Sequence, residues 1–353
     1  MYFILLEDYT CHWTLEPPRF STWSKTYSYS KWNTKIHFIS CCPQMKPYCH
    51  RDLSTSSTPS TPSSKISNIS LLKSHVQKTF RRCETDACLS GFKSLCRLSC
   101  NAALKRLIII IMEDGVFLPC YTACIWLHLC SMYFSYQLTE LDYSYIMSCI
   151  NFACTEFKLK YPLFEISQEW PETKEDKEAK TKKYSDNTFH ESILNIPNER
   201  TRNMALALKL YNDKNIFKLE GDKILAYYTI ETHISYLMNI PEINFSTFVK
   251  IDDVQYLSKE NITIVACDFH VDYELPYIVQ KMCPNYKIEF IKSCIWFMSS
   301  RINKRQSLKL YLNQEEKTLK FENEIYLKYS TFWDKYKISI LNIMLQRMLR
   351  KFL

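Results

Sequence analysis

Residues 141–158, LDYSYIMSCINFACTEFK, constrain the fold more than any other stretch of the chain. Between Asp142 and Glu156 this stretch carries no charge, and its apolar side chains would point to every side of a helix. A helix that is apolar all round belongs inside a domain. The stretch is too short to cross a bilayer, and charged residues stand at both of its ends. We therefore expect the central helix of an all-α core, with Asp142 as its N-terminal cap.

Glycine is scarce, with three residues in a chain of 353. Phosphate-binding loops need several glycines at close spacing, so P-loop enzymes, Rossmann dinucleotide binders and protein kinases are excluded. A chain so poor in glycine and rich in Leu, Ile, Tyr and Lys favours helices. Its length fits one or two domains with a core of ordinary size.

The positive charge is concentrated at the N-terminal end. Residues 1–100 hold 13 Lys/Arg and 6 Asp/Glu, so +7 of the net charge of +8 lies there. The near-neutral remainder argues against direct contact with nucleic acid. Glu7 and Asp8 interrupt the opening apolar run, so no signal peptide is expected. Many of the 16 cysteines lie in apolar segments as small hydrophobes, which indicates a reducing compartment, the nucleus or the cytoplasm.

The first 100 residues show no clear periodicity and contain a Ser/Thr/Pro-rich stretch at 51–65, RDLSTSSTPSTPSSK. Such a composition buries too little apolar surface to fold, so we expect a disordered or irregular N-terminal region. Four cysteines of this region, Cys83, Cys88, Cys96 and Cys100, lack the paired spacing of a structural zinc site. No metal site and no cofactor are expected.

From residue 101 the pattern is helical and falls into two runs. Helices are expected at 103–112, 118–134, 141–158, 201–212 and 222–239, and then at 261–281, 287–303, 331–336 and 338–352. A charged insertion at about 163–195 interrupts the first run; its segment 171–183 holds nine charges in thirteen residues and reads as a solvated loop. Each run has one apolar helix near its centre, which suggests a repeated five-helix unit.

Several short motifs resemble one family, in the order in which that family carries them. Residues 111–116, IMEDGV, resemble a turn after the first helix of the cyclins, and LP followed by TAC and His128 resembles their second helix. Residues 150–158 resemble the end of helix three, TRN at 201–203 the start of helix four, and FW at 332–333 a paired aromatic near the C-terminus. Within the cyclins the resemblance is greatest to the cyclin Q group.

The resemblance implies tandem five-helix cyclin boxes at 101–240 and 241–353, and a regulatory subunit that is not an enzyme. The implied partner is a cyclin-dependent protein kinase, of type ten for the cyclin Q group, which helices three and five of the first box bind and activate. Glu231, nine residues before Ile240, matches a glutamate and a hydrophobe of helix five. Cyclins usually carry a lysine and two glutamates where this chain has Thr155, Phe157 and Lys158, so the family's lysine and glutamates are missing here. Lys158, three residues on from Thr155, shares a helix face with it and could take the place of the missing lysine.

Other interpretations remain open at this point. A cyclin-fold module of the transcription-factor kind would bind protein and DNA, although that class usually carries a zinc ribbon and a basic fold. A helical protein, membrane-associated or not, could also resemble cyclins by accident. Glu231 can equally be an internal ion-pair partner, and His128, between two leucines, is expected to be a hydrogen-bonded core histidine.

Overall fold

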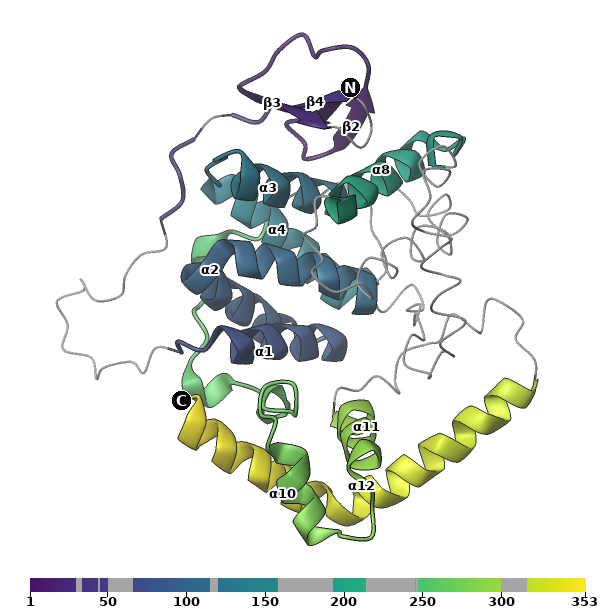
Figure 1. The fold of residues 1–353 in the computed structure, drawn as a ribbon. Helices are drawn as coiled ribbons and strands as arrows, with labels where there is room; N and C mark the ends of the chain where they lie inside the picture. The colour runs from purple at the N-terminus through teal and green to yellow at the C-terminus, as the bar shows by residue number, and fades with distance from the viewer. Residues whose placement is uncertain are drawn as a thin grey trace, which may run out of the picture. The chain divides into compact units, whose positions relative to one another are not determined.

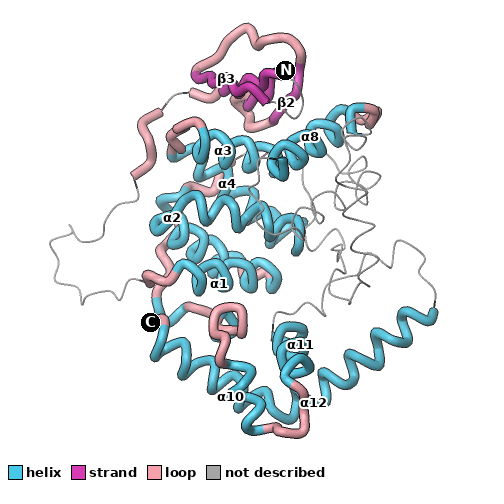
Figure 2. The backbone as a smooth tube through the Cα atoms, viewed as in Figure 1, coloured by secondary structure: helices cyan, strands magenta, loops and turns pink. Residues whose placement is uncertain are grey.

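The computed structural model describes residues 1–29, 34–43, 45–49, 66–114, 120–157, 193–213, 245, 247–299 and 316–353. Helices dominate it, and a small sheet lies near the N-terminus (Figure 1; Figure 2). The chain divides into two compact units, which are described separately. Unit 1 takes Met1–His50, Leu107–Cys149 and Ile166–Ile251, and unit 2 takes Arg51–Arg106, Ile150–Glu165 and Asp252–Leu353.

The sheet of unit 1 consists of β1 (Tyr2–Leu5), β2 (Cys11–Thr14), β3 (Trp23–Tyr29) and β4 (Thr34–Ser40). Its strand order is β2-β1-β4-β3. The central strands β1 and β4 are parallel, with Phe3 opposite Phe38, whereas both outer pairs are antiparallel. The sheet is therefore mixed, and the first strand of the chain lies inside it.

One face of this sheet is buried against helix α3 (Tyr121–Tyr133). In β4, Ile36 and Phe38 are fully buried, as expected for alternate residues on the inner face of a strand. Trp126 of α3 is also fully buried, and its indole N–H donates a hydrogen bond to the carbonyl of Phe3 at 2.9 Å. The sheet and α3 thus share one apolar layer.

The expected fold class, all-α tandem five-helix boxes after a disordered N-terminal region, is wrong. The four strands occupy residues 2–40, and helix α1 together with the first part of α2 also precedes residue 101. Residues 23–29 and 34–40 are rich in Trp, Tyr, Thr and Ile, which favour strands when one face can be buried. Burial against α3 supplies that condition.

Two further helices belong mainly to unit 1: α4 (Glu140–Phe152) and α8 (Glu199–Asp213). One turn of π-helix, η3 (Ala153–Phe157), continues α4. The buried helix predicted at 141–158 is confirmed over α4, where Tyr143, Ile146, Met147 and Ile150 are all buried, although the core around it is not all-α. The helices predicted at 118–134 and 201–212 are confirmed as α3 and α8.

Helix α4 begins with a reciprocal cap in which Thr139, and not Asp142 as predicted, is the capping residue. The backbone N–H of Thr139 donates to the Asp142 carboxylate at 2.7 Å, and the N–H of Asp142 donates to the Thr139 hydroxyl at 3.2 Å. This is a capping box, with Thr139 as the cap and Asp142 three residues later. The buried carboxylate also accepts a hydrogen bond from the Tyr9 hydroxyl at 2.7 Å. Burial raises the pKa of Asp142 despite these bonds.

In unit 2, helices α1 (Ile69–Arg82) and α2 (Thr85–Asp114) approach each other at Gly91. A Cβ atom at this position would lie 2.5 Å from Cδ2 of His75 in α1. Glycine therefore provides the space that the buried imidazole occupies.

Helix α2 is interrupted at Ser99, whose backbone is extended, with φ −164° and ψ 100°. The Ser99 hydroxyl accepts the backbone N–H of Ala102 at 3.2 Å, so it caps the second half of the helix. That second half contains the helix predicted at 103–112.

The remainder of unit 2 consists of 3-10 turns and helices. They are η4 (Ile251–Asp253), which starts at the last residue of unit 1, η5 (Lys259–Asn261), η6 (Ile264–Ala266), α10 (Leu275–Met282), α11 (Ile288–Ser299) and α12 (Glu316–Lys351). The helix predicted at 287–303 is confirmed over α11, and those predicted at 331–336 and 338–352 are parts of the single helix α12.

An α-helix was predicted at 261–281, but residues 261–274 do not form it; the helix starts only at α10. Contacts with α1 hold this segment in another conformation. His75 accepts the backbone N–H of Thr263 at 3.1 Å, and the buried carboxylate of Asp268 pairs with Lys78 at 2.5 Å. The helix predicted at 222–239 and the charged insertion at about 163–195 lie outside the described residues or almost wholly so.

Candidate functional site

The structure places only one of the four residues predicted to bind a kinase. Thr155 lies half-buried in η3, and its hydroxyl donates to the carbonyl of Asn151 at 2.8 Å. Lys158, Glu231 and Ile240 are outside the residues that the structure describes. Whether these four side chains form one surface therefore stays a prediction. His128, by contrast, is a core histidine as expected: it is buried, and its Nδ1 lies 2.9 Å from the Tyr211 hydroxyl.

A candidate interaction surface is found on α12, the long C-terminal helix. One face of this helix completes the core of unit 2, where Phe332, Ile340 and Met344 are buried with residues of α10 and α11. These positions are four or eight residues apart, so they follow one side of the helix.

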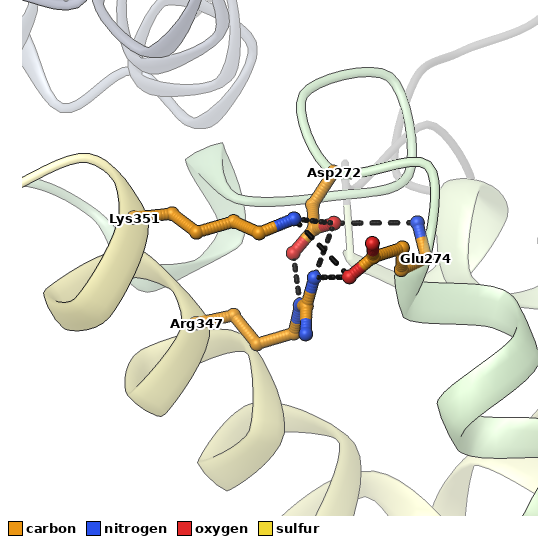
Figure 3. Close-up of polar contacts among 4 residues, drawn as sticks. All are labelled: Asp272, Glu274, Arg347 and Lys351. Carbon is orange, nitrogen blue, oxygen red and sulfur yellow. Dashed lines mark hydrogen bonds and ion pairs between the residues drawn. The ribbon is translucent and has the colours of Figure 1, made fainter.

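A cluster of charged side chains fixes the C-terminal part of α12 beside the start of α10 (Figure 3). The Arg347 guanidinium donates to the Asp272 carboxylate at 2.9 Å and also pairs with Glu274. Lys351, one turn further on, lies 3.4 Å from Asp272 and 3.2 Å from Glu274. The Asp272 side chain is fully buried, so this cluster holds α12 in one rotational setting.

The electrostatics of the cluster are those of a structural ion pair. Burial raises the pKa of Asp272, but hydrogen bonds from Arg347 and the backbone outweigh burial, so the pKa lies below its ordinary value. The hydrogen bonds that Arg347 donates to Asp272 and Glu274 raise the pKa of its guanidinium. Both groups are therefore charged at neutral pH, and neither is suited to exchange a proton with a substrate.

With α12 held in this orientation about its axis, a second apolar row lies on the side of the helix that faces away from the core of unit 2. We call that side the outer side. We call this row the outer seam; it consists of Leu327, Ile338, Leu345 and Leu349. Leu327 is 65% exposed, Ile338 71% and Leu349 56%, while Leu345 is half-buried. At 3.6 residues per turn the four positions fall within about 40° around the helix axis. They lie opposite the core face, which gives α12 two apolar sides.

Unit 1 contains a different kind of feature, a cavity of about 240 Å³. Its polar lining includes Asp8, Thr10, His12, Glu199 and Arg200. The Thr10 hydroxyl donates to Asp8 at 2.7 Å and lies 3.4 Å from Nε2 of His12. The other ring nitrogen of His12 lies 3.9 Å from Glu199. Two carboxylates and one guanidinium line it, so the cavity mixes acidic and basic groups and has no single-sign binding surface for a charged ligand.

The described cysteines whose pKa is shifted are not activated nucleophiles, because each shift is upward. Burial raises the pKa of Cys42, Cys267 and Cys294 to about 12, and it raises those of Cys11 and Cys149 as well. These thiols stay protonated at neutral pH, and the thiolate is the reactive form. Within the described ranges, no group of three His, Cys, Asp or Glu side chains is arranged to hold a metal ion.

Among the helices that the structure describes, none has the length and apolarity needed to cross a bilayer. Comparisons with protein-family models, with curated proteins and with solved structures each found no match. The assignment of a site therefore depends on the geometry of this chain alone.

Sequence reasoning missed the outer seam although the helix predicted at 338–352 holds three of its four residues, because periodicity alone does not tell which apolar side of a helix is buried. The signal was present, since Ile338 and Leu345 are seven residues apart and Leu349 follows four later. The ion cluster had no comparable signal: Asp272 and Arg347 are 75 residues apart in the chain. The cavity was missed because residues 8–12 fell in the region expected to be disordered.

Proposed function

We propose that this chain is a non-enzymatic subunit that binds another protein through the outer seam of α12. The observation that carries the proposal is the row of four apolar side chains in register on the outer side of a helix whose opposite side is already buried. Single exposed leucines are common on protein surfaces, whereas an aligned apolar row marks an interaction site.

The apolar surface of the seam is large enough to matter energetically. Complete burial of a leucine or isoleucine side chain contributes about 1.5–3 kcal/mol. The three exposed members, Leu327, Ile338 and Leu349, would together contribute several kcal/mol to a complex. Association costs of a similar size oppose this gain, so additional contacts must decide the affinity.

The remaining described features support binding more than catalysis. The charged cluster around Asp272 is structural, and the thiols with shifted pKa values are protonated. Regulatory binding also fits the resemblance of the sequence to cyclins.

For the identity of the partner we propose a cyclin-dependent protein kinase, of type ten by resemblance, in the nucleus or the cytoplasm. This part of the proposal comes from the sequence, in which Thr155, Lys158, Glu231 and Ile240 are the predicted kinase contacts. A subunit of this kind acts by binding the active state of the kinase more tightly than the inactive state. No nucleic acid is required.

Co-precipitation with the purified kinase tests both parts. The full chain should retain the kinase, and Ile338→Asp combined with Leu345→Asp should reduce retention at least tenfold if the seam takes part. Lys337→Glu is the matched control, because it places a carboxylate at an exposed position of the same helix that lies away from the seam and from the basic side chains bordering it. Circular dichroism should show all variants folded, since Ile338 is exposed and Leu345 is only half-buried, on the side of α12 away from the core.

The outcomes separate the two parts of the proposal. Equal retention of the kinase by all variants would show that the kinase does not use the seam. Failure of the wild-type chain to retain the kinase would contradict the proposed partner, and the protein-binding role of the seam would then depend on the helix-binding experiment below.

A further inference from the structure

The charged residues of α12 determine which kind of partner can bind the outer seam. Residues 327–353 contain six basic side chains and one acidic side chain, Asp334. Three of the bases have carboxylate partners: Arg347 and Lys351 pair with Asp272 and Glu274, and Lys337 lies 3.3 Å from Asp334. Within the described residues, the remaining three, Lys328, Lys335 and Arg350, have no ion pair.

These three bases border the seam on one side. Lys328 and Lys335 are seven residues apart, and Arg350 follows fifteen residues later, so the three lie within about 60° of one another around the axis. Lys328, Lys335 and Arg350 are all exposed. An apolar row with charged residues along its margin is the arrangement by which helices choose partner helices in coiled coils.

We infer that the outer seam receives an amphipathic helix whose apolar stripe is bordered by Asp or Glu. This inference depends on the proposed function, because it names the kind of protein segment that the seam binds. Carboxylates on the partner would pair with the basic margin, defined by Lys328, Lys335 and Arg350. Such pairs mainly set the choice and orientation of the partner, while the apolar row contributes affinity.

A second copy of this chain fits the seam less well. Over residues 327–353 it would bring the same six basic side chains and one acidic side chain. That acidic residue, Asp334, is already paired with Lys337. Opposed basic margins repel, so self-association through residues 327–353 brings no further carboxylate to the margin.

The length of the seam sets the length of the partner segment. From Leu327 to Leu349 the helix rises about 33 Å at 1.5 Å per residue, which corresponds to about three heptads. A helix of that length can contact all four seam residues and all three margin residues at once.

The test uses the full chain and two synthetic helical peptides of three heptads. Both peptides carry leucine at the core positions; one has Glu along its margins and the other has Lys. In 50 mM salt, fluorescence anisotropy should show the Glu peptide binding at least tenfold more tightly than the Lys peptide. In 500 mM salt the difference should shrink, because the margin contacts are exposed and screened.

Three variants test whether peptide binding uses the outer seam and the basic margin. Changing Lys328, Lys335 and Arg350 to Glu should reverse the preference between the peptides. Ile338→Asp with Leu345→Asp should abolish binding of both. Lys337→Glu is the matched control, because Lys337 lies off this margin and beside Asp334; the preference for the Glu peptide should persist.

Several results would overturn the inference. Equal binding of both peptides would refute the acidic partner while leaving a protein-binding seam. Binding of neither peptide, with a kinase still retained through Ile338 and Leu345, would refute the helical partner alone. Binding of neither, with no seam-dependent kinase retention, would refute the proposed function too. Sedimentation that shows a dimer lost with Ile338→Asp would assign the seam to a second copy.

Discussion

His75 makes the stability of unit 2 depend on pH, and the size of the effect follows from its surroundings. The imidazole is fully buried between α1 and α2. Its Nδ1 accepts the backbone N–H of Thr263 at 3.1 Å, and its Nε2 lies 3.0 Å from the carbonyl of Ala87. These two contacts are satisfied together by a neutral ring that carries its proton on Nε2. Burial lowers the pKa of His75 from 6.5 to about 4, although the bond to Ala87 opposes the shift.

The direction of the pH effect follows from this lowered pKa. The unfolded chain binds a proton at His75 near pH 6.5, whereas the folded chain binds it only near pH 4. Stability is therefore fully present above pH 6.5 and falls as the pH decreases toward 4. From these two pKa values, the free energy of unfolding should decrease by about 2 kcal/mol between pH 7.5 and pH 5.0 through His75 alone.

Urea unfolding followed by tryptophan fluorescence at pH 7.5 and pH 5.0 measures this decrease. In His75→Gln the amide can replace both hydrogen bonds but does not titrate, so most of the decrease should disappear. His12→Gln is the control, because the His12 side chain is 45% exposed and its removal should leave the decrease in place. Identical pH dependence in the wild-type chain and in His75→Gln would refute the reasoning.

Three other substitutions test separate features. Gly91→Ala should destabilise the chain by about 1–3 kcal/mol, since its Cβ would collide with His75, and His75→Ala should relieve part of that loss in urea unfolding of the double variant. Asp272→Asn should cost about 2–3 kcal/mol by leaving Arg347 without its buried partner, whereas Asp334→Asn, in an exposed pair, should cost less than about 0.5 kcal/mol. Glu231→Lys should reduce kinase co-precipitation at least tenfold and leave the melting temperature within a few degrees. Unfolding of that variant would mean that Glu231 is an internal ion-pair partner.

The helical core could be predicted from the sequence, whereas the N-terminal sheet was missed. Residues 141–158 identified α4 because no surface helix can be apolar on every side. The strands at 23–29 and 34–40 contain an alternating pattern, visible in Ile36 and Phe38, but the surrounding Ser and Tyr residues obscured it. Pairing of β1 with β4 joins residues more than 30 positions apart. A local reading of the sequence contains no information on such a pairing.

The candidate site shows the same division between local and distant information. The outer seam is a local pattern, but its exposure became visible only once the opposite side of α12 was seen to be buried. The rotational setting of α12 depends on Asp272 and Glu274, which precede Arg347 by more than 70 residues. Likewise, no sequence rule indicates that the N–H of Thr263 donates to His75, or that the segment around Thr263 is therefore not an α-helix.

The interleaved composition of the two units has a consequence for how the protein is synthesised and folded. The chain passes between the units after His50, Arg106, Cys149, Glu165 and Ile251. Unit 1 contains the first strand, yet the hydroxyls of Ser144 and Ser148 accept the backbone N–H groups of Ile251 and Val249, which are synthesised about 100 residues later. While the chain emerges from the ribosome, neither unit can close until most of it has been made. Contacts at such long sequence separation slow folding and leave apolar segments exposed during synthesis. We therefore expect dependence on chaperones in cells, and slow refolding from urea that deletion from either end cannot accelerate.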